Sequence, residues 1–138
     1  MTSFDLARSY IKKAVVRLDV LDVFHEKGAY SDVMREAQEL VELALKGMLR
    51  FVGIEPPKYH DVGPLLLEHG ERFTDISHKD LQKAAEVSKV LRKEREFSFY
   101  GDIDFIPTEE YTERDAKEAM QGARFVVDLV KKVTAEKK

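Results

Sequence analysis

The sequence predicts an all-α fold, an antiparallel up-and-down bundle of four long helices plus one short helix. Apolar residues recur at alternating spacings of three and four in four long segments, which is the helical period, and no segment shows the alternation of a half-buried strand. The connections between the segments are short, as expected where consecutive helices pack antiparallel. At 138 residues the chain is expected to form a single domain over residues 1–138.

The first helix is predicted from about Phe4 to Glu26, with Ser3 as its N-cap and Gly28 as its C-cap. Its apolar stripe comprises Phe4, Ala7, Ile11, Ala14, Leu18 and Leu21. His25 extends this stripe by one turn. We interpret His25 as a packed or interface histidine rather than a metal ligand.

The second helix is predicted from just after Ser31 to about Val52, and Gly53 ends it. The proline pair Pro56 and Pro57 then gives a stiff connection, because each proline biases the residue before it away from the α region. The apolar face of this helix is broad, which predicts burial between several neighbours. It comprises Met34, Ala37, Leu40, Val41, Ala44, Leu45, Met48, Leu49 and Phe51.

A short helix is predicted from His60 or Asp61 to about His69, where Gly70 closes it. Pro64 lies near its start, where proline is tolerated. We expect His60 and Asp61 to act at the helix start, since an Asp there satisfies free backbone amides.

Two capping patterns open the remaining long helices. Ser77 and Asp80 have capping-box spacing at the start of a helix predicted to run to about Tyr100, and Thr112 and Asp115 repeat the pattern at the last helix. The small residues at the start of the last helix predict a close approach to a neighbouring helix. Its stripe comprises Ala116, Ala119, Ala123, Val126, Val130 and Val133.

Composition restricts where the protein works and what it binds. Hydrophobic residues make up 43% of the chain and charged residues 36%, there is no cysteine, and no apolar run is long enough to span a membrane. We therefore expect a cytoplasmic protein without membrane contact. The formal net charge of −3 argues against coating of nucleic acid by bulk electrostatics, so nucleic-acid binding would need a local basic patch.

Such a local patch exists in the helix that ends near Tyr100. From Lys79 to Arg95 there are six basic residues and three acidic ones. A solvated helix face is the commoner meaning of such a run. Lys89, Arg92 and Arg95 are its candidate ligand-binding cations.

Arg95 falls at a position where the pattern of this helix calls for an apolar residue. Its inward stripe comprises Leu81, Ala84, Ser88, Leu91 and then Arg95. A guanidinium is costly to bury alone, so Arg95 either meets a carboxylate or a ligand phosphate, or reaches past the core into water. Phe99 lies one turn further on the same face, while Tyr100 is turned to the side.

Other chemistries lack support in the sequence. His69 and His78 stand in polar, turn-rich surroundings without metal-ligand spacing, so we expect no metal site and no cofactor. The seven glycines are scattered at helix ends and turns and form no phosphate-binding loop. No Ser-His-acid arrangement is apparent.

The chain resembles the HEPN family, the higher-eukaryote and prokaryote nucleotide-binding domains. The resemblance begins at Ala37-Gln38-Glu39-Leu40-Val41-Glu42-Leu43-Ala44-Leu45-Lys46 and continues through Gly53, His60-Asp61 and Leu65-Leu66 to Arg95, Tyr100-Gly101-Asp102 and the Ala-rich last helix. It covers nearly the whole chain. Each of these pieces alone is weak, and their combination is fairly specific.

The resemblance implies a helical bundle that forms homodimers through its later helices, in many members beside a small nucleotidyltransferase in toxin-antitoxin-like pairs. Many members are metal-independent ribonucleases with an Arg followed after four to six residues by a His. Here the Arg is Arg95, and Tyr100 stands where the His would be. Tyrosine, with an ordinary pKa of about 10, is a poor base at neutral pH, although it can donate a hydrogen bond or stack on a base. Arg72 and His78 also fit the spacing, outside the family's motif position, and we interpret that match as coincidence.

The expected function is a homodimeric nucleotide- or RNA-binding module, the partner of a small nucleotidyltransferase, with Lys89, Arg92, Arg95 and Phe99 as binding residues. The alternative is an endoribonuclease toxin in which Arg95 stabilises the phosphate and Tyr100, or a His brought in from elsewhere, completes the site. A third reading is a dimeric scaffold in which Arg95 pairs across the interface with Asp102 or Glu94.

Overall fold

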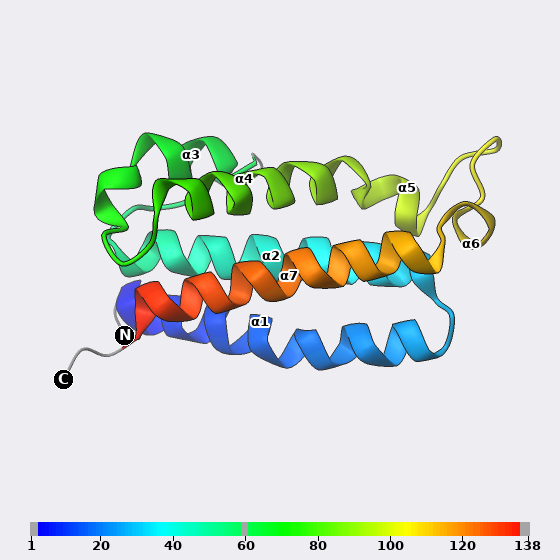
Figure 1. Cartoon of the computed structure of the whole chain (residues 1–138), viewed down its shortest axis with the longest axis horizontal. Helices are drawn as coiled ribbons and strands as arrows, with labels where there is room; N and C mark the ends of the chain where they lie inside the picture. The colour runs from blue at the N-terminus through cyan, green and yellow to red at the C-terminus, as the bar shows by residue number, and fades with distance from the viewer. Residues whose placement is uncertain (1–2, 59–60, 136–138) are drawn as a thin grey trace.

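The computed structural model describes residues 3–58 and 61–135, and it confirms the all-α fold class. Its four long helices are α1 (Ser3–Glu26), α2 (Tyr30–Phe51), α4 (His78–Lys93) and α7 (Glu113–Thr134). They lie side by side along the long axis of the molecule and alternate in direction (Figure 1). Helix α2 contacts each of the other three. The described residues contain no strand.

The short elements are more numerous than the sequence predicts. They are α3 (Gly63–Glu68), the 3₁₀ turn η1 (Gly70–Arg72), α5 (Arg95–Phe99) and α6 (Pro107–Glu110). Helix α3 is the predicted short helix, and its first turn contains Pro64. It begins later than expected, and His60 lies outside the described residues.

The helix predicted to reach Tyr100 ends at Lys93, so this boundary was wrong. The amide of Glu94 bonds the carbonyl of Leu91 at 3.1 Å, three residues back instead of four, which interrupts the α-helical ladder. A new turn then starts, with the amide of Ser98 bonded to the carbonyl of Glu94 at 2.8 Å. Arg95 consequently begins a separate short helix at one end of the bundle.

The predicted glycine ends of α1 and α2 are confirmed. Gly28 has φ 71° and Gly53 has φ 85°, in the left-handed region that glycine adopts without strain. After each, an amide bonds a carbonyl five residues back: Ala29 to Phe24 and Ile54 to Leu49, both at 2.9 Å. Ser3 lies inside α1, and its side chain is outside the described residues.

The predicted N-caps of α4 and α7 are also present. Ser77 Oγ accepts from the amide of Asp80 at 3.1 Å. At α7 the capping box is complete, because Thr112 accepts from the amide of Asp115 and the Asp115 carboxylate accepts from the amide of Thr112.

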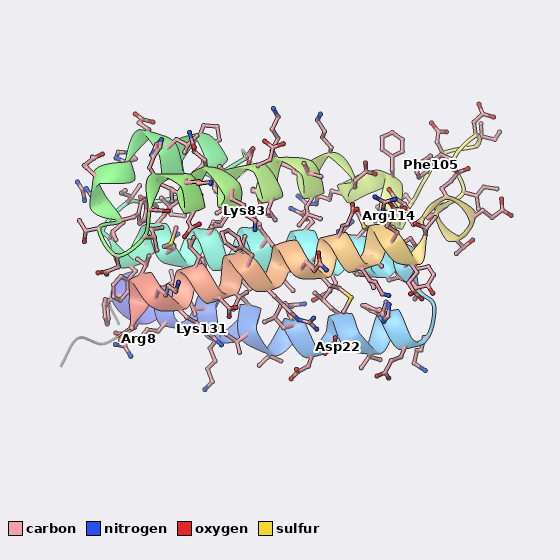
Figure 2. All side chains as sticks on the ribbon, viewed as in Figure 1. Arg8, Asp22, Lys83, Phe105, Arg114 and Lys131 are labelled. Carbon is pink, nitrogen blue, oxygen red and sulfur yellow. The ribbon has the colours of Figure 1, made fainter. Side chains whose placement is uncertain are left out.

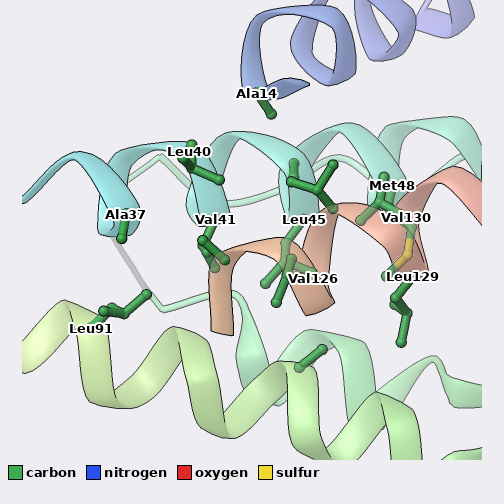
Figure 3. Packing of buried hydrophobic residues seen from close by; sticks show 14 of the residues in the cluster. Ala14, Ala37, Leu40, Val41, Leu45, Met48, Leu91, Val126, Leu129 and Val130 are labelled. Atoms are coloured by element: carbon green, nitrogen blue, oxygen red, sulfur yellow. The ribbon is translucent and has the colours of Figure 1, made fainter. Parts of the chain in front are cut away.

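The core lies between α2 and the helices around it (Figure 3). Leu40, Leu45 and Leu49 of α2 are fully buried, and burial of each leucine side chain contributes about 1.5–3 kcal/mol. The small residues predicted at the start of α7 are buried as well, which lets α7 approach α2. Phe51 departs from the predicted stripe, because it lies at the edge of the core against the ring of Phe4. Across the described ranges, no helix combines the length and the apolar character needed to cross a bilayer.

Candidate functional site

Arg95 lies at the edge of the bundle and is paired with an acid of α2. Its Nη2 is 3.5 Å from Oε1 of Glu39, and its side chain is 39% exposed. The residues before it on the inward stripe are buried, as predicted, down to Leu91. Of the readings left open by the sequence, Arg95 combines two: it meets a carboxylate and remains accessible to solvent.

Asp102 and Glu94, the acids considered for a pairing with Arg95 across an interface, have other partners within the chain. Asp102 Oδ1 accepts from the amide of Ile103 at 2.7 Å, and Glu94 accepts from the hydroxyl of Tyr111 at 2.5 Å. The acid that Arg95 meets is Glu39, from a helix more than fifty residues earlier in the sequence.

Arg35 is a member of the site that sequence reasoning missed. From α2, its Nε bonds Glu39 at 3.2 Å and its Nη1 reaches the carbonyl of Arg95 at 3.5 Å. Its guanidinium carbon also lies 4.9 Å from the ring centroid of Phe99, in a cation–π arrangement. In the sequence, Arg35 and Glu39 form an ordinary i,i+4 surface pair, so nothing marked Arg35 as special.

Arg92, one turn before Arg95, repeats the pairing with α2. Its Nη1 lies 2.7 Å from Oε1 of Glu42, and Lys46 approaches the same oxygen at 3.7 Å. Glu39 and Glu42 of α2 therefore each join two cations. The result is a ladder of alternating charges between α2 and the α4–α5 junction, and its cations remain partly exposed.

The cations and aromatic residues of this region enclose an open recess of about 570 Å³. Among the side chains that the structure describes, no acidic one lines it. The recess is lined by Arg35, Arg92, Lys93, Arg95, Phe97 and Tyr100. The structure thus brings together Arg92, Arg95 and Tyr100 of the sequence-predicted set. Lys89 is exposed on α4 but does not line the recess, and Phe99 borders a neighbouring recess that shares Arg35.

Tyr100 is the most accessible of the three aromatic residues of this segment. It is 75% exposed, and its ring lies edge-on to that of Phe99 with 4.8 Å between centroids. Its hydroxyl has no hydrogen-bond partner among the described residues. Phe97 and Phe99 are about half exposed. These rings can stack on nucleobases while the neighbouring cations meet phosphates.

The segment after Tyr100 forms a tight exposed loop. Gly101 follows α5 with φ 68°, in the left-handed region that glycine adopts without strain. The backbones of Asp102 and Phe105 exchange two hydrogen bonds of 2.9 Å, and Ile103 at the tip is 89% exposed. Together with Phe97, Phe99, Tyr100 and Ile106, this tip makes an exposed apolar surface at one end of the bundle.

The three histidines that the structure describes, His25, His69 and His78, lie outside the basic recess. His25 packs beside Tyr30, with 6.0 Å between ring centroids, in agreement with its predicted packed position. His69 ends α3, and His78 begins α4. Arg72 donates to the carbonyl of Val52 at 2.9 Å, at the end of the bundle opposite α5 (Figure 1). The Arg72 and His78 pair is therefore remote from the recess that Arg95 lines.

Asp61 performs the predicted function at a helix start. Its Oδ1 accepts from the amide of Gly63 at 3.1 Å and from Oγ of Ser88 at 2.8 Å, which joins α3 to α4. Within the part of the chain that the structure describes, no three potential metal-ligating side chains cluster.

The family comparison agrees with the resemblance seen in the sequence. The model of the HEPN domain matches residues 7–133, nearly the whole chain. No curated protein and no solved structure matched the chain.

Proposed function

Because the chain belongs to the HEPN domain family, whose members commonly dimerise and bind RNA, we propose that it is a homodimeric nucleotide- or RNA-binding module. The observation that carries the proposal is the recess at the α4–α5 junction. Three guanidinium groups and the Lys93 ammonium surround it, no acidic residue is among its described lining residues, and Tyr100 stands exposed at its side. A chain with net charge −3 thus keeps a local basic and aromatic surface.

The chemistry of binding follows from the pairings. A phosphate oxygen that approaches Arg95 competes with Glu39, and one that approaches Arg92 competes with Glu42. Guanidinium groups bind phosphate in a planar, bidentate geometry, and exposed rings stack on bases without regard to sequence. The expected ligand is a single-stranded RNA or a nucleotide, and its affinity should fall as the salt concentration rises.

The homodimer is proposed to form through the apolar surface around the 101–106 loop. Ile103 and Ile106 are 89% and 47% exposed on a short segment, which costs free energy unless another surface covers them. Dimerisation there would place two basic recesses close together. A small nucleotidyltransferase as the partner, in a toxin-antitoxin-like pair, is supported by the family resemblance, and co-purification of the two co-expressed chains tests it.

The second candidate function is metal-independent RNA cleavage. It is favoured by the placement of Arg95 and Tyr100 in one recess, where a guanidinium stabilises phosphate charge and a phenol donates a hydrogen bond. None of the described residues that line the recess is a histidine, the usual base in such chemistry. This is why binding without strong nuclease activity is the function we propose first.

The deciding experiment titrates a short labelled RNA with the full chain by fluorescence anisotropy. Arg95→Glu should weaken binding by about tenfold or more, because it replaces a phosphate-binding charge with a repelling one. Lys131→Glu makes the same charge change at the other end of the bundle (Figure 2) and should stay within about twofold of wild type. Equal effects of the two substitutions would place RNA binding elsewhere.

Incubation of the chain with the same RNA in the presence of EDTA distinguishes RNA binding from metal-independent RNA cleavage. We expect intact RNA with the wild-type chain. Metal-independent cleavage that Arg95→Ala abolishes would establish the ribonuclease instead.

A further inference from the structure

Another recess lies on the opposite flank of α4, between α4 and α7, and has a volume of about 490 Å³. We call it the α4–α7 groove. The two helices meet closely at Gly122, where an added Cβ would lie 3.1 Å from Cγ1 of Val87. The groove extends from there toward Phe105 and Tyr111, and Lys83 and Phe105 mark its two ends (Figure 2). It shares no lining residue with the basic recess.

The floor of the groove is apolar. Met34, Leu91 and Ala119 form part of it and belong to the hydrophobic core. Val90 stands at its lip and is 49% exposed. An apolar surface of this kind gains free energy when a partner covers it.

The rim of the groove is acidic. Five carboxylates line it, against the single ammonium of Lys83. That ammonium lies 4.1 Å from the ring centroid of Phe125. The five acids are Glu86, Glu94, Glu110, Asp115 and Glu118.

Some of these acids have structural partners, and others remain available to bind a cationic side chain of a partner. Glu94 accepts from Tyr111, and Asp115 belongs to the capping box of α7. Among the described residues, the partner of Glu118 is Arg114, in an exposed i,i+4 pair. Glu86 and Glu110 are exposed and form no ion pair with the residues that the structure describes. The negative charge at the rim is therefore only partly compensated.

We propose that the α4–α7 groove binds a basic amphipathic helix of a partner protein. Apolar side chains of that helix cover Val90 and the groove floor, while its Lys and Arg side chains meet the acidic rim. The lining positions run from Lys83 on α4 to Glu94, the C-cap of α4, at helical spacing, which spans about 16 Å, or roughly three helical turns. Nucleic acid is unsuited to this site, because the rim repels phosphates.

A second copy of the chain is a poorer occupant. Among its long helices, α1 presents the exposed apolar residues Val16 and Val23. That helix carries four acidic and four Lys or Arg residues, so it lacks the positive charge that the rim requires.

The test uses two synthetic helical peptides with the same leucine stripe, one with Lys and the other with Glu at every polar position. We expect saturable one-to-one binding of the Lys peptide to the full chain by calorimetry and no binding of the Glu peptide. The double substitution Glu86→Lys and Glu118→Lys should weaken binding by about tenfold or more. The matched change of two exposed acids elsewhere, Asp19→Lys and Asp128→Lys, should leave it within about twofold of wild type.

A second pair of variants separates docking from general attraction between charges. Val90→Ser should weaken binding of the Lys peptide severalfold. Val16→Ser, at an exposed valine of α1, should leave that binding unchanged. Circular dichroism melting establishes that each variant is folded, and RNA binding should stay unchanged in the two valine variants. Absence of saturable binding, or equal losses in groove and control variants, would overturn the proposal. Light scattering tests the alternative occupant. If the chain binds no peptide, and the double substitution Glu86→Lys and Glu118→Lys changes the molecular mass in solution, the groove would be assigned to a second copy of the chain.

Discussion

Arg95 and Glu39 form an ion pair with 3.5 Å between Nη2 and Oε1, so Glu39 occupies the side of Arg95 that we propose for a ligand phosphate. The same oxygen of Glu39 also accepts from Arg35. A carboxylate so placed both orders the two guanidinium groups and competes with an incoming anion. The side chains of Arg95 and Glu39 are 39% and 35% exposed, so water and salt screen the pair. The competition between Glu39 and an incoming anion is therefore modest.

The first prediction is that Glu39→Gln tightens the binding of pyrophosphate and short RNA by about threefold to tenfold. The amide keeps the shape and an acceptor oxygen but loses the charge, and a change of roughly 1 kcal/mol corresponds to this range. Anisotropy and calorimetric titrations measure it. Glu36→Gln is the matched control, because Glu36 lies one turn earlier on α2 and pairs with Arg17. Weaker RNA binding by Glu39→Gln would mean that Glu39 positions the cations more than it competes with the ligand.

The second prediction concerns the capping box of α7. Thr112→Ala removes the acceptor of the Asp115 amide and should lower the free energy of unfolding by about 0.5–2 kcal/mol. Thr112→Ser keeps the hydroxyl and should lose only a small part of that. Urea unfolding followed by circular dichroism gives both values. If the Ser and Ala variants lose the same stability, the methyl group rather than the cap is responsible.

Local patterns in the sequence predicted most of the fold correctly. The apolar stripes of α2 and α7, the glycine ends at Gly28 and Gly53, and the cap at Thr112 all depend on residues within a few positions of one another. Such features are decided by the helical period and by backbone chemistry. The buried stripe of α4 from Leu81 to Leu91 was predictable for the same reason.

Features that depend on distant residues were not predictable. The pairing of Arg95 with Glu39 and that of Arg92 with Glu42 join positions fifty or more residues apart, and no local pattern reports them. The end of α4 before Glu94 was not predicted either, because the residues around Glu94 continue the helical period. The side chain of Glu94 also makes a contact that no local pattern reports, because it accepts from the hydroxyl of Tyr111, seventeen residues later.

The third prediction is that Gly47→Ala destabilises the bundle. In an ordinary helix interior this change would stabilise by about 0.5–1 kcal/mol. Here the new Cβ would lie 3.0 Å from Cγ1 of Ile11 and 3.2 Å from the carbonyl oxygen of Ala7, where α1 and α2 cross closely. Overpacking of this kind costs about 1–3 kcal/mol, so a net loss of about 1 kcal/mol is expected.

Thermal unfolding compares this variant with Gly122→Ala. The nearest neighbours of a Cβ at Gly122 are side-chain atoms of Val87, which can move, whereas the Ala7 carbonyl belongs to a helix backbone. Gly122→Ala should therefore be closer to neutral. A stabilised Gly47→Ala variant would show that α1 shifts away from α2 without cost.

The fourth prediction is an alkaline loss of stability that depends on Tyr111. Burial and the hydrogen bond to Glu94 raise the pKa of the Tyr111 phenol well above its ordinary value of about 10. A pKa that is higher in the folded than in the unfolded state favours folding while the phenol is protonated. This contribution is complete below about pH 10 and declines as the pH rises further, through the pKa of the folded state.

Tyr111→Phe should accordingly be less stable than wild type near neutral pH by about 1 kcal/mol, the typical worth of one hydrogen bond. The difference in stability between the two proteins should shrink as the pH rises from about 9 to about 11. Over this range the unfolded wild type loses the phenol proton, whereas its folded state must keep the proton or bury a phenolate, and Tyr111→Phe has no phenol at this position. Urea unfolding at a series of pH values measures the difference. Glu94→Gln retains an acceptor but removes the charge that helps to raise the pKa, so its pH dependence should lie between the two. Wild-type and Tyr111→Phe curves that stay parallel over the alkaline range would show that Tyr111 ionises as readily in the folded chain as in the unfolded one.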